Sequence, residues 1–223
     1  MKIEIEYGGI STADAWLIRH SDETGTIRLN ATITEPARQR FSIAHELGHW
    51  ELHPDVKQGY LCTAKDLRDY GRSPEEAEAN WFAATLLMPK FLILDAILKK
   101  DPGFALISQL AKEFQTSLTA AARRFVELSK QPVVLVSSSD NRVNWTARSK
   151  SAGYYFVPPG SLVPQHSLTA ETVAAGLSES PADALDPLTW FPDLNFSEDA
   201  ELFEAVRYSA GYDTALTLLW LPV

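Results

Sequence analysis

The stretch FSIAHELGHWELH constrains the fold of this chain most strongly, because it places three histidines at four-residue intervals. On a helix, His45, His49 and His53 fall on one face, one turn apart. Apolar residues recur at helical spacing in the same segment. A helix that opens at Pro36 should end before Pro54, since a residue that precedes proline is pushed out of the α region. The pattern therefore predicts a helix that carries a row of imidazoles.

The first two of these histidines have the spacing of metal ligands. Zinc binds imidazole nitrogens at about 2.0–2.1 Å in roughly tetrahedral geometry, so His45 and His49 can converge on one ion. Glu46 lies beside the first ligand, where its carboxylate can reach a metal-bound water without entering the coordination shell. This HExxH arrangement is typical of metalloproteases, in which the glutamate is the general base. The alternative is an amphipathic helix with surface histidines.

Gly48 lies between the two ligand candidates, in the interior of the predicted helix. Glycine there costs about 1 kcal/mol of helix stability relative to alanine. We therefore expect that something approaches the helix backbone closely at Gly48.

A catalytic metal site needs a third protein ligand, and the sequence offers more than one candidate. His53 is eight residues after His45, a helical rise of about 12 Å, which is too long for both to bind one ion while the helix continues. We expect His53 to cap the helix C-terminus, where its partial positive charge suits the helix dipole. Cys62 can bind zinc and lies downstream of the histidine pair.

The remaining candidate lies on a second predicted helix, PEEAEANWFAATLL. Its start is indicated by Ser73 as a capping residue, with proline in the first turn. Glu76 and Asn80 are four residues apart and point to one side, so Glu76 can complete a His₂Glu set. Asn80 can then hydrogen-bond the free ring nitrogen of a ligand histidine. Glu78 lies two residues after Glu76 and therefore points elsewhere by about 200° around the helix, which makes it the weaker candidate.

The whole chain has the pattern of an α+β protein. The segments KIEIEY, AWLIRH and GTIRLN predict strands, and a short helical pair follows the second helix across residues 90–129. The segment PVVLVSSSDNRVNWTARS predicts a hairpin around a Ser-Asp-Asn turn. Beyond it we expect a helix near 168–177, a Pro- and Asp-rich loop, a helix near 198–209 and a terminal strand, TALTLLWL. The fold class is α+β: a small N-terminal antiparallel sheet with the HExxH helix and a helical subdomain, then a mixed α/β C-terminal region.

Composition narrows the classes of function. Residues 151–223 carry ten acids and one base, so this section holds the entire net charge of −9. A nucleic-acid-binding protein usually shows a basic face. The single cysteine cannot form an internal disulfide, which fits the reducing cytoplasm. The first residues lack the apolar region of a signal peptide. Pro89 and Lys90 interrupt the longest apolar run, so we expect no membrane span.

Residues 106–128, LISQLAKEFQTSLTAAARRFVEL, resemble a helix-turn-helix with a turn near residues 115–117. The wider span 99–130 has six bases and three acids. A DNA-binding or protein-binding regulator with a non-catalytic metal site is therefore the alternative function. However, only Arg123 and Arg124 offer strong contacts to DNA, and they lie late in the second helix. We favour a helical hairpin that supports the active-site helices, and we expect no direct DNA binding.

The two helix segments together resemble a known family. RQRFSIAHELGHWELH and the later EAEANWFAATLLMP match the paired RxRFxxAHELGH and ExxANxFAxxLLMP patterns of the ImmA/IrrE family of bacterial zinc metallopeptidases. The resemblance implies that His45, His49 and Glu76 bind Zn²⁺, or Mn²⁺ in its place. It implies Glu46 as the catalytic base and Asn80 as the partner of a ligand histidine.

The resemblance also implies a substrate and a domain arrangement. Members of this family cleave helix-turn-helix repressors, often encoded nearby, and so relieve transcriptional repression. We expect a zincin-like metallopeptidase domain over residues 1–130, which includes the helix-turn-helix-like segment. Residues 131–223 should form a mixed α/β domain, either a sensor for a small ligand or a platform for the substrate protein.

Overall fold

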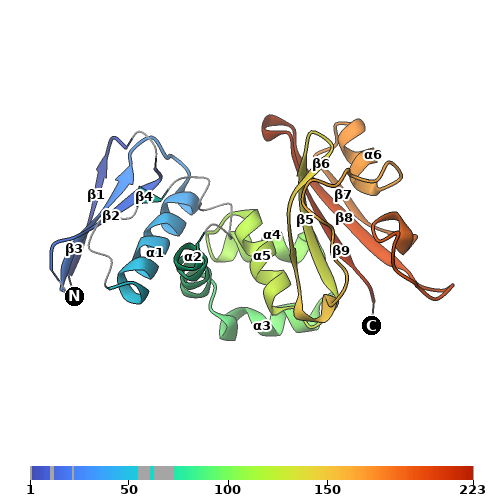
Figure 1. Ribbon diagram of the computed structural model, residues 1–223, viewed down its shortest axis with the longest axis horizontal. Helices are drawn as coiled ribbons and strands as arrows, with labels where there is room; N and C mark the ends of the chain where they lie inside the picture. The colour runs from blue at the N-terminus through green and yellow to red at the C-terminus, as the bar shows by residue number, and fades with distance from the viewer. Residues whose placement is uncertain (1, 11–12, 22, 55–60, 63–72, 223) are drawn as a thin grey trace. The chain divides into compact units, whose positions relative to one another are not determined.

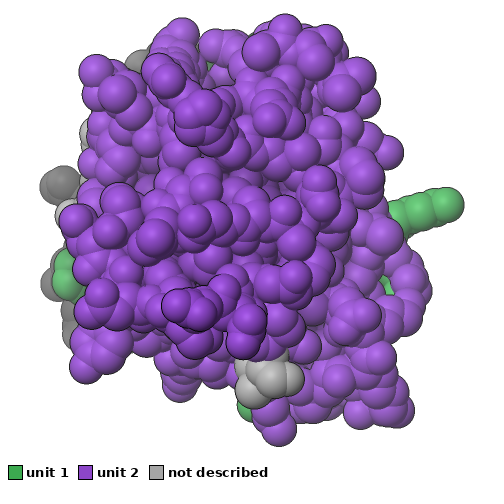
Figure 2. All heavy atoms as spheres, turned by 90° about the vertical axis from the view of Figure 1, so that its right-hand side faces the viewer, with its two compact units in different colours: residues 1–90, 112–117 green, residues 91–111, 118–223 purple. Residues whose placement is uncertain are grey.

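The structure is a computed structural model, and its chain divides into two compact units. Unit 1 comprises residues 1–90 and 112–117, and unit 2 comprises residues 91–111 and 118–223 (Figure 2). The residues that the structure describes are 2–10, 13–21, 23–54, 61–62 and 73–222 (Figure 1).

Unit 1 contains a four-stranded sheet with the order β1-β3-β2-β4. Its strands are β1 (Lys2–Gly8), β2 (Ala15–Arg19), β3 (Thr24–Asn30) and β4 (Leu61–Cys62). β2 pairs antiparallel with β3 and with β4, whereas β1 pairs parallel with β3. The predicted strands are confirmed, but the prediction of an antiparallel sheet was wrong, because the sheet is mixed. Alternation with period two reports which face of a strand is buried, and it is the same for both strand directions.

The described part of unit 1 also contains two helices, one between β3 and β4 and one after β4. α1 (Pro36–Leu52) packs on the sheet through Trp50, which contacts Leu17 of β2 and Ile27 of β3 in one buried cluster. α1 ends where the following proline predicts, and the backbone N–H of His53 caps it by donating to the carbonyl of His49 (3.1 Å). α2 (Pro74–Leu87) begins at the predicted cap, where the backbone N–H of Glu76 donates to the Ser73 hydroxyl (3.3 Å).

The backbones of α1 and α2 come very close at Gly48, and the two helices lie side by side in Figure 1. A Cβ atom at Gly48 would lie 3.0 Å from Ala79 Cα, 3.1 Å from the Ala79 carbonyl oxygen and 3.2 Å from Phe82 Cβ. All three atoms belong to α2, and two of them are backbone. The predicted close approach at Gly48 is therefore confirmed, and α2 is the element that makes it.

Three helices occupy the segment where the sequence predicted a pair. They are α3 (Lys90–Lys99), α4 (Phe104–Glu113) and α5 (Leu118–Leu128). The intervening Asp-Pro-Gly at 101–103 separates α3 from α4, because proline and glycine both disfavour a continuing helix. The turn between α4 and α5 lies where expected, and Gln115 adopts a positive φ of 51° there.

Unit 2 contains a five-stranded antiparallel sheet with the order β6-β5-β9-β8-β7. Asp140 and Asn141 form the predicted turn of the β5–β6 hairpin with φ angles of 50° and 57°, as a tight hairpin requires. The predicted helix near 168–177 and the terminal strand are also confirmed. The elements are β5 (Val133–Ser139), β6 (Arg142–Arg148), α6 (Leu168–Ala174), β7 (Glu179–Leu185), β8 (Leu202–Ser209) and β9 (Thr214–Trp220), with short 3₁₀ helices at Lys150–Ala152, Pro187–Thr189 and Ala210–Tyr212.

Two predictions for this region were wrong. The segment 198–209 was predicted to be helical, but β8 covers most of it, and β7 lies within the predicted loop. β8 is held between β7 and β9. Residues such as Leu, Glu and Ala favour a helix only weakly, and pairing with strands distant in the sequence overrides that preference.

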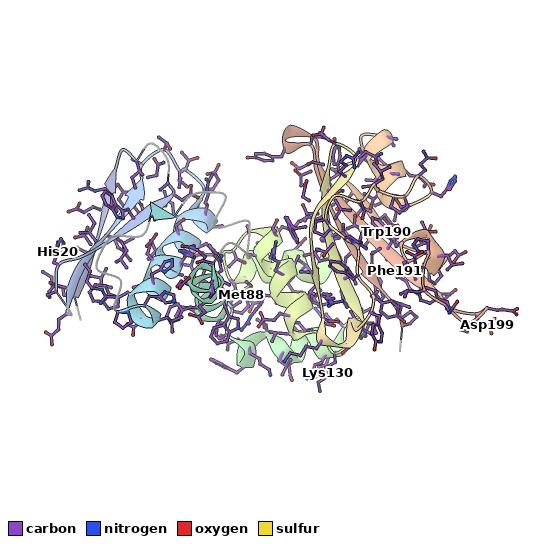
Figure 3. The ribbon with its side chains drawn as sticks, in the orientation of Figure 1. His20, Met88, Lys130, Trp190, Phe191 and Asp199 are labelled. Carbon is purple, nitrogen blue, oxygen red and sulfur yellow. The ribbon has the colours of Figure 1, made fainter. Side chains whose placement is uncertain are left out.

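Both faces of the second sheet are covered, which explains the nearly continuous burial of β5 and β9. α5 packs against β5 and β6, while α6 packs against β8 on the opposite side (Figure 1). Trp190 and Phe191, labelled in Figure 3, join Val134 and Val136 in the core on the α6 side. No single described helix is long and apolar enough to cross a membrane; Pro74–Leu87 with Lys90–Lys99 meets that criterion only as a joined pair, bent at the break between them.

Candidate metal centre

Three side chains from α1 and α2 converge within unit 1. His45 and His49 are fully buried, and their Nε2 atoms lie 3.0 Å apart. Glu76 approaches both of them: its Oε2 lies 3.2 Å from His45 Nε2 and its Oε1 lies 3.3 Å from His49 Nε2. Among the described residues, this is the only group of three or more His, Cys, Asp or Glu side chains whose ligand atoms all lie within 4.8 Å of one another.

Asn80 determines which ring nitrogen of His45 carries the proton. Its Oδ1 lies 3.0 Å from His45 Nδ1, and Asn80 is fully buried. An amide oxygen only accepts hydrogen bonds, so His45 Nδ1 carries the hydrogen and the Nε2 of the neutral ring carries a lone pair. That lone pair points toward the carboxylate of Glu76 and the Nε2 of His49. Electron-pair donors that meet in this way without a hydrogen between them form a site for a cation.

The distances fit a transition-metal ion. A tetrahedral ion at about 2.0–2.1 Å from each ligand separates the ligand atoms by about 3.3–3.4 Å. The two Nε2 atoms of His45 and His49 are 3.0 Å apart, and the distances from His45 Nε2 and His49 Nε2 to the Glu76 carboxylate are 3.2 and 3.3 Å. All three distances are close to those that a tetrahedral ion requires. Two imidazoles and one carboxylate are also a donor set that zinc and manganese accept. Three protein ligands leave one position of a tetrahedron for water or substrate.

The charges of the site also favour a cation. Burial alone would raise the pKa of Glu76, but hydrogen bonds and positive charge from protonated imidazoles of His45 and His49 would outweigh burial and lower that pKa to about 2, so the ionised carboxylate is the form that a neighbouring positive charge stabilises. Burial lowers the pKa of His49, which favours the neutral imidazole. Because an imidazolium is disfavoured here, a bound metal ion is the better source of positive charge beside Glu76.

Glu46 lies next to this group and is fully buried on α1. The backbone of Leu17 is near enough to favour the charged form slightly, but neither carboxylate oxygen makes a hydrogen bond of ordinary geometry in the described part of the chain. Burial, followed by the charge of Glu76, raises the pKa of Glu46 well above its usual range. A buried carboxylate without donors is costly, and such groups mark functional sites. A carboxylate that acts as a general base is expected to lack hydrogen-bond donors in the free protein, because its oxygen must be available to accept a proton from the reacting water.

His53 and Glu78 belong to the surroundings of the site and not to the converging group. His53 Nδ1 lies 3.0 Å from His49 Nδ1, on the side of the ring opposite to Glu76, and His53 Nε2 lies 3.0 Å from Glu78 Oε2. The expected position of His53 as the C-terminal cap is confirmed. The sequence did not reveal its contacts with His49 and Glu78, because a helical register shows no tilt between helices. Cys62 lies in β4, but its side chain is outside the described residues, so its candidacy remains a prediction.

The two arginines of the helix-turn-helix-like segment make contacts within unit 2. The Arg123 guanidinium lies 3.6 Å from the centre of the Trp145 ring. Arg124 is buried and pairs with Glu127 at 2.7 Å. Both side chains are therefore engaged within unit 2, which disfavours their contact with the phosphates or bases of a duplex.

Comparison with known proteins agrees with this arrangement. The model of the IrrE N-terminal-like domain, Peptidase_M78, matches residues 1–126. The chain is 32% identical over 117 residues to a radiation response metalloprotease IrrE of Deinococcus deserti, and 31% identical over 114 residues to that of Deinococcus radiodurans. These matches cover 52% and 50% of this chain but only 41% and 34% of the two relatives. The matched region contains all of the converging side chains, and it covers more than half of the chain, so this protein belongs to the IrrE N-terminal-like family of M78 peptidases.

Proposed function

We propose that this protein is a zinc-dependent endopeptidase and that Mn²⁺ can replace Zn²⁺ in its metal site. The observation that carries the proposal is the convergence of three electron-pair donors, on His45, His49 and Glu76. Beside them is the buried carboxylate of Glu46, neither oxygen of which makes a hydrogen bond of ordinary geometry to the residues that the structure describes. The two Deinococcus relatives are named metalloproteases, which supports the same activity here. The single cysteine supports a cytoplasmic location.

Each residue of the site has a separate role in the proposed hydrolysis of a peptide bond. A divalent cation bound here supplies Lewis acidity, which polarises the substrate carbonyl and acidifies water. His45, His49 and Glu76 hold that cation, and Asn80 fixes the ring of His45. Glu46 takes a proton from the attacking water as the new carbon–oxygen bond forms. It then returns the proton to the amine nitrogen as the carbon–nitrogen bond breaks.

The pKa of Glu46 suits this role in a specific way. Without a cation, burial and the charge of Glu76 keep that pKa high. A nearby cation opposes both effects, because it stabilises the carboxylate form. Metal binding is thus expected to lower the pKa of Glu46 from its raised value and so to favour the carboxylate form that accepts a proton.

For the substrate, we propose a helix-turn-helix transcriptional repressor encoded close to this protein. The support is the resemblance of both helix segments to the ImmA/IrrE family. Cleavage would relieve repression. Direct DNA binding by this chain is not proposed, since Arg123 and Arg124 make contacts within the protein.

The test uses a purified helix-turn-helix repressor that is encoded close to this protein. The repressor is incubated with the protein and Zn²⁺ or Mn²⁺, and its fragments are identified by mass spectrometry. Glu46→Gln should keep the metal and lose about 10²–10⁴-fold in cleavage rate, the usual contribution of a general base. Glu51→Gln is the matched control, because Glu51 is an exposed acid on the same helix. Equal cleavage by Glu46→Gln and the wild type would reject Glu46 as the base.

A further inference from the structure

We propose that His53 and Glu78 are positioning residues, which hold His49 in the tautomer and orientation that bind the metal. The proposal rests on the proposed metal site and extends it to two side chains outside the ligand set. It assigns a role to a chain of contacts, from Glu78 through His53 to His49, that crosses from α2 to α1.

The hydrogen positions along this chain follow from the acceptor at its outer end. The ionised carboxylate of Glu78 can only accept, so the hydrogen between it and His53 belongs to His53 Nε2. A neutral His53 then has a lone pair at Nδ1. The contact between His53 Nδ1 and His49 Nδ1, at 3.0 Å, therefore has His49 Nδ1–H as its donor.

The consequence lies at the other nitrogen of His49. With its hydrogen on Nδ1, the neutral ring of His49 has its lone pair at Nε2, which is the atom that faces Glu76 and His45. If His53 were in the opposite tautomer, its own Nδ1–H would confront His49 Nδ1. His49 would then have its hydrogen on Nε2, inside the metal site. Glu78 thus favours, two rings away, the tautomer of His49 that can bind a metal.

Both ligand histidines are held by a hydrogen bond from Nδ1 to an acceptor outside the metal site. His45 Nδ1 donates to the amide oxygen of Asn80, and His49 Nδ1 donates to His53, whose other nitrogen is fixed by Glu78. In each case the outer acceptor comes from α2. Acceptors of this kind orient ligand rings and raise their basicity.

The burial of His53 and of Glu78 indicates how much metal affinity should fall when each side chain is removed. The side chain of His53 is only 8% exposed, whereas that of Glu78 is 61% exposed. Water can partly replace Glu78 as an acceptor, so its loss should matter less than the loss of His53. Loss of an outer partner of a ligand typically costs about 10–100-fold in metal affinity.

The first test measures zinc affinity by competition with a chromogenic chelator. It asks whether His53 and Glu78 increase the affinity of the site for the metal. His53→Ala should weaken zinc binding by about 10–100-fold, and Glu78→Gln by about 10-fold. His53→Gln should lie between His53→Ala and the wild type, because its amide oxygen can accept the same His49 N–H. Glu113→Gln is the control: it removes an exposed acid on α4, outside the two helices that carry the site, and should leave the affinity unchanged. The melting temperature of the metal-free Glu78→Gln protein should also stay unchanged, since Glu78 is exposed.

The tautomers provide a readout that a merely structural role would not change. The chain has five histidines, so ring ¹⁵N signals can be assigned with single substitutions. His53 should carry its hydrogen on Nε2 in the wild type, with and without zinc, and should become a mixture of tautomers in Glu78→Gln. The Nδ1–H tautomer of His53 in the metal-free wild type, or unchanged zinc affinity in both His53→Ala and Glu78→Gln, would overturn the proposal. A wild type that shows the expected tautomer but binds no zinc would instead overturn the proposed function and its metal site.

Discussion

The substitution Gly48→Ala tests how closely the metal site depends on the contact between α1 and α2. An alanine in the middle of α1 should favour the helix itself by about 1 kcal/mol. Against this, the new methyl group would lie 3.0 Å from Ala79 Cα and 3.1 Å from its carbonyl oxygen. Carbon atoms in ordinary contact are about 3.5–4.0 Å apart, so α2 must move away by about 0.5 Å. Such overpacking typically costs about 1–3 kcal/mol.

That displacement acts directly on the proposed metal ligands, because His45 and His49 lie on α1 and Glu76 lies on α2. The histidine–carboxylate separations of 3.2 and 3.3 Å would grow beyond the about 3.3–3.4 Å that tetrahedral zinc requires. To bind zinc, the variant must bring α2 back against the new methyl group. If that costs about 1.4 kcal/mol, zinc affinity falls about 10-fold. The free energy of unfolding of the metal-free protein should change by about 0–2 kcal/mol in the destabilising direction.

The assay combines chemical denaturation of the metal-free protein with chelator competition for zinc. Gly9→Ala is the control, since a Cβ atom at Gly9 would meet nothing within 4 Å. A Gly48→Ala protein that is more stable than the wild type and binds zinc equally well would refute the reasoning.

Three further predictions concern stability. Arg38→Ala should cost about 1.5–3 kcal/mol of unfolding free energy in urea denaturation, because it leaves the buried Asp14 carboxylate without its two short hydrogen bonds of 2.6 and 2.7 Å; a cost below about 0.5 kcal/mol would contradict this account of Asp14. Burial raises the pKa of Glu204 above the ordinary 4.5, despite hydrogen bonds from Thr169 and Trp190. The stability that this raised pKa contributes is therefore fully present below pH 4.5, and it is lost as the pH rises through the pKa of the folded state. Relative to Glu204→Gln, the wild type should therefore lose up to about 1.4 kcal/mol per pH unit in that window, and a difference independent of pH would contradict the shift. Free zinc at 100 times its dissociation constant should stabilise the folded protein by about 2.7 kcal/mol, an effect that a chelator reverses and that Glu76→Ala abolishes in thermal melts.

The features that the sequence predicted are those determined over short distances along the chain. The helix from Pro36 to the residue before Pro54, the cap at Ser73 and the hairpin turn at Asp140 depend on neighbouring residues only. The expected close approach at Gly48 followed from the cost of a glycine inside a helix. The spacing within each helix also placed Glu76 and Asn80 on one side of α2, and the structure brings both of them to the histidine pair.

The features that the sequence did not predict depend on partners far away along the chain. The parallel pairing of β1 with β3 leaves no mark on the alternation of either strand. β8 forms because β7 and β9 flank it, although its own residues also suit a helix. Glu78 was placed away from the site by counting residues along an ideal helix. Glu78 does lie outside the ligand group, and what the sequence did not reveal is its contact with His53.

The central claim, that His45, His49 and Glu76 hold a catalytic metal ion, is tested most directly by the metal content of the purified protein. Mass spectrometry of metal-loaded wild type should find one zinc or manganese ion per chain. Glu46→Gln should retain that ion, whereas Glu76→Ala with an unchanged circular dichroism spectrum should lose it. A wild type that binds no metal, or a folded Glu76→Ala protein that keeps a full equivalent, would contradict the account.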